Sequence, residues 1–376
     1  MILRKFWEGR SSMITAIILL FFIVSFQSTI AQEEIEGSHH EAEQHSEKEF
    51  NAGELIFEHV LDAHDWHIAD IGEHPITVPL PIIILDENNN LHMFMSSRFE
   101  HGHAAYDGFK LEIEGENKGK IVPVVEGTME TDSTRPLPYD FSITKTVFAI
   151  MFSALLLMLI FITIAKSYKK REGQAPAGLQ SFLEPIILFV RDDIAKPSIG
   201  HRKYEKYMPY LLTLFFFILI NNLLGIVPIF PGGANVTGNI GVTMVMALFT
   251  FAITSFSANK AYWVHIINMP GVPWWLKFPI PIMPMVEIMG VFTKPFVLMV
   301  RLFANMLAGH IVVLGFISMI FIFGAMNVFG GYGVSVVSVA FSVFLSLLEI
   351  LVAFIQAYVF TLLSALYFGM AMEESH

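Results

Sequence analysis

The sequence predicts an all-α polytopic membrane protein that carries a small β-containing domain near its N-terminus. Of its 376 residues, 54% are hydrophobic, 35 are phenylalanine and only 15% are charged, whereas a soluble globular chain is about 25% charged. Acidic residues crowd into the first part of the chain, while Lys and Arg punctuate the apolar remainder. With a net charge of -11 and no basic face for phosphates, a nucleic-acid partner is excluded. The absence of cysteine excludes disulfides, thiolate metal sites and cysteine nucleophiles.

Residues 1–31 have the pattern of a signal peptide. Three basic residues precede the apolar core MITAIILLFFIVSF, and small residues stand before Gln32. We expect cleavage after Ala31. The alternative is an uncleaved anchor helix, which the short core disfavours because a span takes about 20 residues. In both cases the chain that follows lies outside the cytoplasm, beginning with a disordered, acidic, His-rich tail over residues 32–49.

Residues 50–140 are expected to form a small, β-rich periplasmic domain. Apolar residues recur at helical spacing between Phe50 and Ile68, which predicts a short amphipathic helix. The stretches ITVPLPIIIL, LHMFMSS and KLEIEG come next, and the polar segments DENNN, YDG and ENKG lie between and after them. This alternation predicts short strands joined by turns.

Ten of the 14 histidines precede residue 145. A metal site is one interpretation, because His-rich tracts bind metals. The other interpretation is a solvated acidic surface that is rich in histidine. We favour the second and predict no metal and no cofactor, because no set of carboxylates and histidines falls at a recognisable ligand spacing. The histidines concerned are His39, His40, His45, His64, His67, His101 and His103.

Residues 141–376 are expected to form the membrane domain, which begins with a span over 146–165. The basic cluster KSYKKR follows this span at once, so the positive-inside rule places that end in the cytoplasm. Residues 178–196 are amphipathic and too short in apolar length to span, which predicts an in-plane helix on the cytoplasmic surface. Two more spans are predicted over 208–228 and 239–258, and the Trp-containing loop after them suits an interfacial aromatic belt.

Two overlong apolar runs, 285–326 and 333–371, close the chain. Each is about twice as long as a perpendicular span requires. The first run is either two spans with a hidden turn or one very long, strongly tilted helix, and the second run is of the same kind. With long tilted helices the chain has about five membrane helices, and its polar C-terminus lies in the cytoplasm.

The first long run carries an arginine in its middle. An ionised side chain at bilayer depth costs roughly 3 kcal/mol on insertion scales and is rare away from an ion or substrate pathway. Seven residues advance about 700° on an ideal helix, so Glu287, Lys294 and Arg301 lie on one stripe, which Asn305 continues. Small residues beside it allow another helix to approach. His310 lies about 180° around the helix from Arg301 and faces the other way.

The second long run has a polar face of its own. Glu349 and Gln356 are seven residues apart, and Ser342, Ser346 and Ala353 lie on the same side. Two tilted helices, each with one stripe of ionisable or amide side chains, are what a proton path across half a membrane needs.

Simpler structural roles compete with this interpretation. Arg301 could snorkel toward an interface, but about 15 mostly apolar residues on either side place it deep. Glu349 and His310 could be a buried structural pair, which is compatible with function. Gln356 could bond only to a neighbouring helix. Glu287 and Lys294 could form a pair seven residues apart or cap a cytoplasmic channel entrance, and neither is expected to have a direct catalytic role.

These segments resemble a known family. RLFANMLAG at 301–309 is similar to the hallmark arginine segment of subunit a of F-type ATP synthase, the membrane stator beside the rotating c-ring. NLLGIVP at 222–228, VTMVMAL at 242–248 and the C-terminal IQAYVFTLLSALYFGMAMEES resemble the same family in order and spacing. The resemblance covers the membrane domain.

The resemblance implies two half-channels that couple proton flow to ATP synthesis. Arg301 would face the c-ring carboxylates with Asn305 beside it, favouring the ionised form of each passing acid and blocking leakage between the half-channels. His310, Glu349 and Gln356 would line the periplasm-facing half-channel. The implied setting is a bacterial inner membrane, and the implied partners are the c-ring, the peripheral-stalk subunit b and lipid. The chain itself would hold no catalytic site, and the transported ion is H⁺ or Na⁺.

Two features depart from the family pattern. In better-known members the position of His310 is often a glutamate and that of Glu349 is often a histidine, so the two types are exchanged here. Either arrangement supplies one carboxylate and one imidazole across facing helices. The long periplasmic domain is the second departure, and the resemblance implies no role for it.

Two other functions fit parts of the sequence. A free-standing secondary transporter could use an arginine and carboxylate pathway, but that class usually shows internal repeats, and we find no convincing repeat. A periplasmic metal-binding protein with a membrane anchor would use the His-rich domain, but it leaves Arg301 and Glu349 unexplained.

Overall fold

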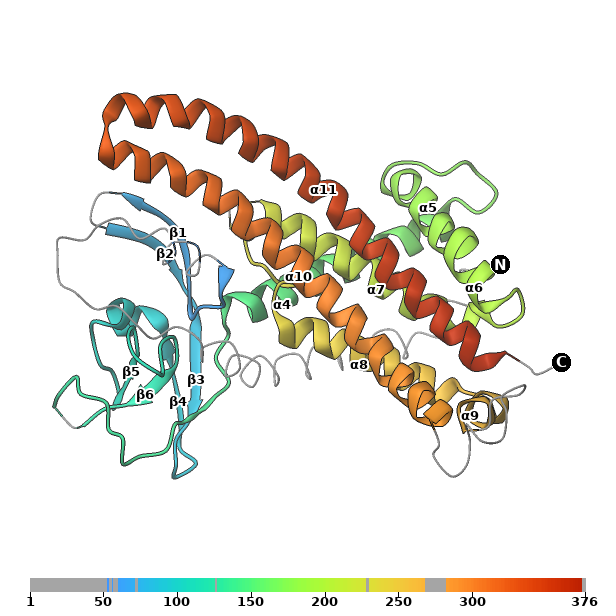
Figure 1. Ribbon diagram of the computed structural model, residues 1–376, viewed down its shortest axis with the longest axis horizontal. Coiled ribbons are helices and arrows are strands. Elements are labelled where there is room, and N and C mark those ends of the chain that lie inside the picture. Colours follow the sequence, from blue (N-terminus) through green and yellow to red (C-terminus); the bar gives the residue numbers. More distant parts are fainter. Residues whose placement is uncertain are drawn as a thin grey trace.

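The computed structural model describes residues 53, 56, 60–71, 74–125, 127–227, 230–267 and 282–373. Within them, a β-rich region is followed by five helices that are long and apolar enough to cross a membrane (Figure 1). These five helices are α4 (Lys145–Lys170), α7 (Tyr204–Ile226), α8 (Ile240–Ser257), α10 (Ile282–Met326) and α11 (Val328–Met372). The predicted fold class is confirmed. The expected signal peptide and acidic tail lie outside the described residues.

The β-rich region contains three small antiparallel sheets, in the orders β1-β2, β4-β3-β7 and β5-β6. The strands are β1 (Asp65–Ile71), β2 (His74–Pro79), β3 (Pro81–Leu85), β4 (Leu91–Met95), β5 (Phe109–Leu111), β6 (Ile121–Pro123) and β7 (Tyr139–Asp140). The first two predicted strand segments are confirmed, and the first of them divides at Leu80 into β2 and β3. Of the third segment, KLEIEG, only Lys110 and Leu111 lie in a strand, β5.

The helix expected between Phe50 and Ile68 is wrong in its second half. No helix continues past Val60, and β1 begins at Asp65. The reason is tertiary: the side chains of Asp62 and His64 bond to residues at the start of α4 and at the end of β7. These long-range contacts override the helical spacing of the apolar residues.

Alternation along β3 builds the core of this region. Ile82 and Ile84 are fully buried on one face of the sheet. They pack against Phe109 of β5, Ile121 of β6 and Phe99 of the 3-10 helix η2 (Ser96–Gly102). The other face of the sheet carries Ile83 and, on β4, the exposed side chains of Leu91, Met93 and Met95.

The segment from Asp62 to Trp66 connects the β-rich region to the membrane helices through side-chain contacts. The Asp62 carboxylate accepts hydrogen bonds from Thr144 Oγ1 at 2.7 Å and from the backbone N–H of Thr146 at 2.9 Å, so it caps the start of α4. Trp66 is buried in the same apolar cluster as the membrane helices. Its ring meets those of Phe148 in α4 and Phe230 edge-on, with centroids 5.6 Å and 5.2 Å away.

The amphipathic helix predicted over 178–196 is present as three consecutive helical pieces. It consists of α5 (Leu179–Phe189), a π-helical turn (Val190–Ala195) and α6 (Lys196–Ile199). The segment packs against α11 near that helix's C-terminal end, as Figure 1 shows. A short helix, α9 (Lys260–Ile267), follows α8, and the Trp274–Trp275 part of the expected aromatic belt lies outside the described residues.

Each overlong run is one unbroken helix of 45 residues. This result decides between the two alternatives left open by the sequence. At 1.5 Å per residue such a helix is about 68 Å long, whereas the hydrocarbon core is about 30 Å thick. The two helices form an antiparallel hairpin (Figure 1), and α11 packs on α7 while α10 packs on α8. Asn327 makes the turn, and its side chain accepts from the Phe329 N–H at 3.0 Å.

Candidate functional site

The hairpin of α10 and α11 brings His310 and Glu349 together. His310 Nδ1 lies 3.3 Å from Glu349 Oε1, and the two side chains are only 15% and 13% exposed. Two glycines, Gly309 and Gly225, leave the space that this approach requires. A Cβ on Gly309 would come within 2.8 Å of Glu349 Oε1, and one on Gly225 within 3.4 Å of His310 Nε2. An imidazole and a carboxylate at this distance can exchange a proton.

Buried amides gather on α7 and in the loop after it, close to His310. Asn221 and Asn222 of α7 are buried, as are Asn235 and Thr237 of the loop. The Thr237 hydroxyl donates to Asn222 Oδ1 at 2.5 Å. Among the described residues, several buried polar atoms here have no hydrogen-bond partner: Asn221 Oδ1, Asn222 Nδ2, Asn235 Nδ2 and His310 Nε2.

Our reading of the sequence missed these amides as site residues. The signal was present, because two adjacent amides in the middle of an apolar span are costly unless they serve packing or a polar path. The Asn235 to Thr237 segment has no such signal in the sequence, since it lies in an ordinary polar turn.

The polar face predicted on α11 is turned into the protein. Gln356 is 5% exposed and makes no hydrogen bond within the described part of the chain. Ser342, seven residues before Glu349, has a buried hydroxyl oxygen without a partner among the same residues. Glu349 lies between them on this inward stripe.

Arg301 lies on the opposite side of α10 from His310, as the 180° spacing predicts. Arg301, Asn305 and Ala308 are all exposed. Among the described residues Arg301 makes no hydrogen bond and no ion pair, although Tyr367 of α11 lies within its electrostatic range. The structure therefore keeps Arg301 apart from the His310 and Glu349 pair.

A small cavity lies among α8, α9, α10 and α11, and Lys294 lines it. Thr250, Thr254 and Tyr262 also line the cavity, whose volume of about 20 Å³ is room for about one water. Lys294 Nζ lies 5.7 Å from the ring centroid of Tyr367. Glu287 acts electrostatically on Tyr262 and forms no ion pair with Lys294 within the described residues.

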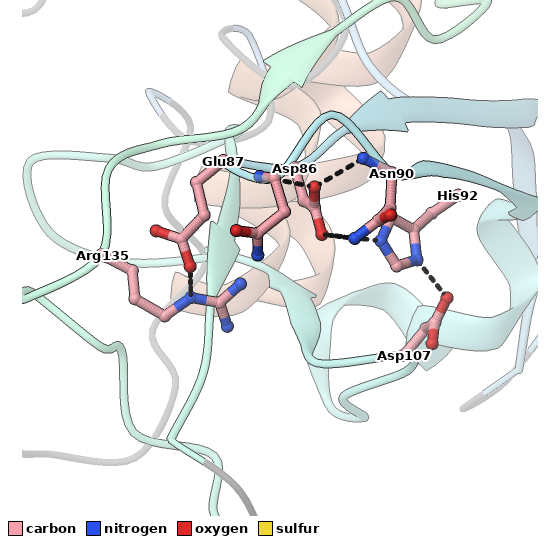
Figure 2. Close-up of polar contacts among 7 residues, drawn as sticks. Asp86, Glu87, Asn90, His92, Asp107 and Arg135 are labelled. Carbon is pink, nitrogen blue, oxygen red and sulfur yellow. Dashed lines mark hydrogen bonds and ion pairs between the residues drawn. The ribbon is translucent and has the colours of Figure 1, made fainter.

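Three histidines of the β-rich region, His64, His92 and His101, pair with carboxylates. His92 lies between two of them, with Nδ1 2.5 Å from Asp107 Oδ2 and Nε2 3.5 Å from Asp86 Oδ2 (Figure 2). The hydrogen bond with Asp107 raises the pKa of His92 above its usual value. Backbone and side-chain hydrogen bonds from Asn90 lower the pKa of Asp86 to about 2. Such pairs stabilise the turns that carry them, and the carboxylates in these pairs are already bonded to histidine.

No metal-binding group of three or more His, Asp or Glu side chains occurs in the part of the chain that the structure describes. His64 pairs with Asp140 at 2.7 Å and His101 with Asp65 at 2.9 Å. His39, His40 and His45 lie outside the described residues.

Comparison with known proteins gives two family matches. The family described as ATP synthase A chain matches residues 147–369, a range that contains all seven predicted site residues: Glu287, Lys294, Arg301, Asn305, His310, Glu349 and Gln356. A second family, described as Domain of unknown function (DUF8433), matches residues 55–141.

Three relatives named ATP synthase subunit a illustrate the similarity. The protein of Chloroherpeton thalassium is 46% identical over 245 residues, which cover 63% of this chain and 69% of the relative. That of Chlorobium phaeobacteroides strain BS1 is 42% identical over 282 residues, or 73% and 76% of the two chains. That of Myxococcus xanthus is 45% identical over 242 residues, or 63% and 75%. The chain therefore belongs to the ATP synthase A chain family, the proton-translocating stator subunits that serve the F-type ATP synthase without being catalytic themselves.

Proposed function

We propose that this chain supplies two half-channels and an essential arginine beside the c-ring, and so couples proton flow to ATP synthesis. The observation that carries the proposal is the position of Arg301. It is exposed on a long apolar helix and has no hydrogen bond or ion pair among the described residues. Because an ionised group at this depth requires a partner, the partner is expected from outside the chain, and ring carboxylates supply the complementary charge.

Arginine suits this task because it keeps its charge. Its guanidinium does not deprotonate in proteins, whereas a lysine shifts its pKa readily when it is desolvated. A fixed positive charge favours the ionised form of an approaching carboxylic acid. Each ring carboxylate would therefore pass Arg301 deprotonated, with Asn305 one turn along the same exposed face as a neutral hydrogen-bonding neighbour. Direct leakage of protons past this point is opposed by the same charge.

His310, Glu349 and Gln356 form the proposed periplasm-facing half-channel. The 3.3 Å contact of His310 with Glu349 and the amide atoms Asn221 Oδ1 and Asn222 Nδ2, which have no partner among the described residues, support this role. Buried polar groups without a protein partner are the places where water is retained. A chain of amides, water, imidazole and carboxylate is a competent proton relay.

The second half-channel is proposed on the other side of Arg301 along α10. The cavity lined by Lys294 and the nearby Glu287 support an entrance there. The Tyr367 ring, which lies next to Lys294 and within electrostatic range of Arg301, connects this cavity to the arginine.

The proposed setting is a bacterial inner membrane, with a signal peptide over residues 1–31 and the β-rich region in the periplasm. The basic cluster after α4 supports this orientation, and it places the C-terminus in the cytoplasm. Besides the c-ring, subunit b of the peripheral stalk is the proposed protein partner. The ion is H⁺ or Na⁺, because the selecting carboxylates would lie in the ring.

ATP-driven pumping in membrane vesicles that carry the whole complex tests the proposal. Arg301→Ala and Arg301→Lys should both reduce pumping to background, because neither keeps a permanent guanidinium charge. Val300→Ala is the matched control, since Val300 is an exposed neighbour on the same helix, and it should pump normally. Normal pumping by Arg301→Lys would show that the site needs only an anchored positive charge and would refute the proposed role.

The paired relay has its own test in the same vesicles. The exchange of His310→Glu with Glu349→His keeps one imidazole and one carboxylate in contact, so it should retain part of the pumping. Each single substitution leaves two like groups and should pump less than the exchange. An exchange that is no better than either single variant would contradict the relay.

A further inference from the structure

One face of the β4-β3-β7 sheet is wholly apolar, and most of its side chains are exposed. Opposite residues in antiparallel strands share a face, and the register pairs Leu85 with Leu91 and with Tyr139. Backbone hydrogen bonds from Phe141 to Ile83 and from Ile143 to Pro81 extend the third strand. The open face is thus a three-by-three array of Pro81, Ile83, Leu85, Leu91, Met93, Met95, Tyr139, Phe141 and Ile143.

The exposure of this array is unusual for a soluble surface. Leu91, Met93, Met95, Tyr139 and Phe141 are between 42% and 68% exposed. None of the nine residues is charged. Contiguous apolar patches of this kind mark a binding surface for protein or membrane, and the structure offers three observations that decide between them.

The first observation is continuity with the membrane domain. The column Tyr139, Phe141, Ile143 runs directly into Thr144, which caps the first membrane-spanning helix α4. At about 3.3 Å per residue, Phe141 lies within about 10 Å of that cap along the chain. The open face therefore ends beside the N-terminus of the first helix that is long and apolar enough to cross a membrane.

The second observation is direction. In Figure 1, β5 and β6 lie on the side of β3 and β4 that is away from the membrane helices. Because β5, β6 and η2 cover the other face of the sheet, the open face is turned toward the side on which the helices lie.

The third observation is that the sheet cannot swing freely on α4. Asp62 is bonded to Thr144 and Thr146, and the backbone N–H of Lys145 donates to Ala63 O at 2.9 Å. His64 bonds to Asp140 of β7 itself. The segment from Asp62 to His64 therefore bonds both to β7 and to the start of α4. These bonds fix the angle of the open face relative to α4.

We propose that the open face lies on the lipid surface at the N-terminal end of α4. The β-rich region would then rest on the membrane and support this helix. Met and Leu side chains would enter the interfacial zone, and Tyr139 would sit where its hydroxyl remains wet, as tyrosines do at membrane interfaces. The polar tail over residues 32–49 does not complement such a face. The proposal depends on α4 crossing the membrane and does not depend on the proton path.

Lipid quenching in the assembled complex tests the proposal. The chain has no cysteine, so Met93→Cys can carry a single polarity-sensitive fluorophore in nanodiscs of phosphatidylcholine brominated near the headgroup end of its acyl chains. Leu155→Cys, exposed on α4, is the lipid-facing reference, and Glu116→Cys, exposed in the β5–β6 turn, is the water-facing control. Tyr139→Cys provides a second position on the open face in case Met93→Cys fails to assemble.

The label at Met93 or Tyr139 should show apolar emission and at least half of the quenching seen at Leu155, while the label at Glu116 should show neither. Water-like, unquenched emission from the open face would overturn the proposal. Apolar but unquenched emission would overturn it as well, because it would mean that a protein surface, either another subunit or residues 1–59 of this chain, covers the face instead of lipid.

Discussion

The β-rich region and the membrane region treat their charges in opposite ways. In the β-rich region, several charged side chains pair with one another: His64 with Asp140, His101 with Asp65, His92 with Asp86 and Asp107, and Arg135 with Glu87. In the membrane region Arg301 has neither a hydrogen bond nor an ion pair among the described residues. Charges that are satisfied within the chain hold its shape, whereas an unsatisfied charge at bilayer depth requires a partner from elsewhere.

The His310 and Glu349 pair stands between these extremes. It is paired within the chain, but His310 Nε2 is buried without a partner among the described residues. A structural pair would be expected to satisfy all of its buried polar atoms. Loss of a residue that is satisfied within the chain should therefore reduce stability, whereas loss of a residue with an unsatisfied polar group should reduce pumping.

The largest stability effect is expected from Trp66→Ala at the joint between the two regions. Trp66 is 3% exposed and packs on Phe148 and Phe230. Truncation of a buried Trp costs about 3–5 kcal/mol, so protease resistance of the β-rich region should be lost at a lower temperature. Trp263→Ala is the control, because Trp263 is 41% exposed and should cost below about 0.5 kcal/mol.

Trp66→Ala also tests whether the β-rich region takes part in proton transport. Pumping per assembled complex should be unchanged in Trp66→Ala, because no proposed proton-path residue touches Trp66. A loss of pumping that matches that of Arg301→Ala would show that the β-rich region takes part in transport, and the division drawn above would be wrong.

Gly369→Ala should destabilise the membrane region through packing alone. A Cβ at this position would lie 1.9 Å from the carbonyl oxygen of Ser198, a backbone atom that cannot rotate away. Overpacking of this kind costs about 1–3 kcal/mol, and the end of α11 should separate from α6. Detergent-induced dissociation of the complex measures the effect. Gly333→Ala, where nothing lies within 4 Å of the added Cβ, should dissociate no more easily than the unaltered complex.

Gly309→Ala should affect pumping more than stability. Its Cβ would lie 2.8 Å from Glu349 Oε1, the atom that contacts His310. The carboxylate is the flexible end of its side chain, so it can move at little cost in stability, but the move breaks the pair. A displacement of about 1 Å can reduce rate by up to about 100-fold, and we expect roughly a tenfold loss of pumping.

Gly315→Ala is the matched control for this substitution on the same helix, because nothing lies within 4 Å of its added Cβ. It should pump normally. Equal pumping by the two variants would mean that the contact between His310 and Glu349 is structural, and the relay would have to be abandoned.

The sequence predicts the membrane region better than the β-rich region, for a physical reason. Length and apolarity alone decide whether a helix can span, so the positions of the membrane segments follow directly from composition, although the number of helices in the run 285–326 does not. The 180° separation of Arg301 from His310 follows from helix geometry. The contact between His310 and Glu349 required the additional knowledge that α10 and α11 form a hairpin, which the two alternatives for 285–326 left undecided.

The errors lie where tertiary contacts decide local structure. The segment from Asp62 to Trp66 lies within the stretch that has helical spacing, yet it is not helical because its side chains bond to α4 and β7. The cluster of Asn222 with Thr237 is likewise invisible along the chain, since the two residues are 15 positions apart and meet only when the loop folds back on α7. No periodicity records such contacts.

The smallest effect, and the most direct test of pairing in the β-rich region, is the pH dependence of its stability. Burial by itself lowers the pKa of His64, but the hydrogen bond with Asp140 and the nearby carboxylates outweigh burial, and the pKa is raised above 6.5. Burial raises the pKa of Asp140, but the hydrogen bond and charge of His64 outweigh it, and the pKa is lowered below 3.8. Folding therefore favours the charged form of both groups.

The sign of the effect follows from linkage. A histidine whose pKa is raised by folding contributes stability below 6.5 that is lost as the pH rises through the raised value. The Asp140 contribution is present above 3.8 and is lost as the pH falls through its lowered value. Resistance of the β-rich region to protease should therefore decrease as the pH rises above 6.5. His64→Gln should reduce that slope, and the part that remains belongs to His92, whose pKa is raised in the same direction.

His103→Gln, at an exposed histidine with no ion pair among the described residues, should leave the slope unchanged. If His64→Gln keeps the full slope, the pairing of His64 with Asp140 does not hold this region in shape.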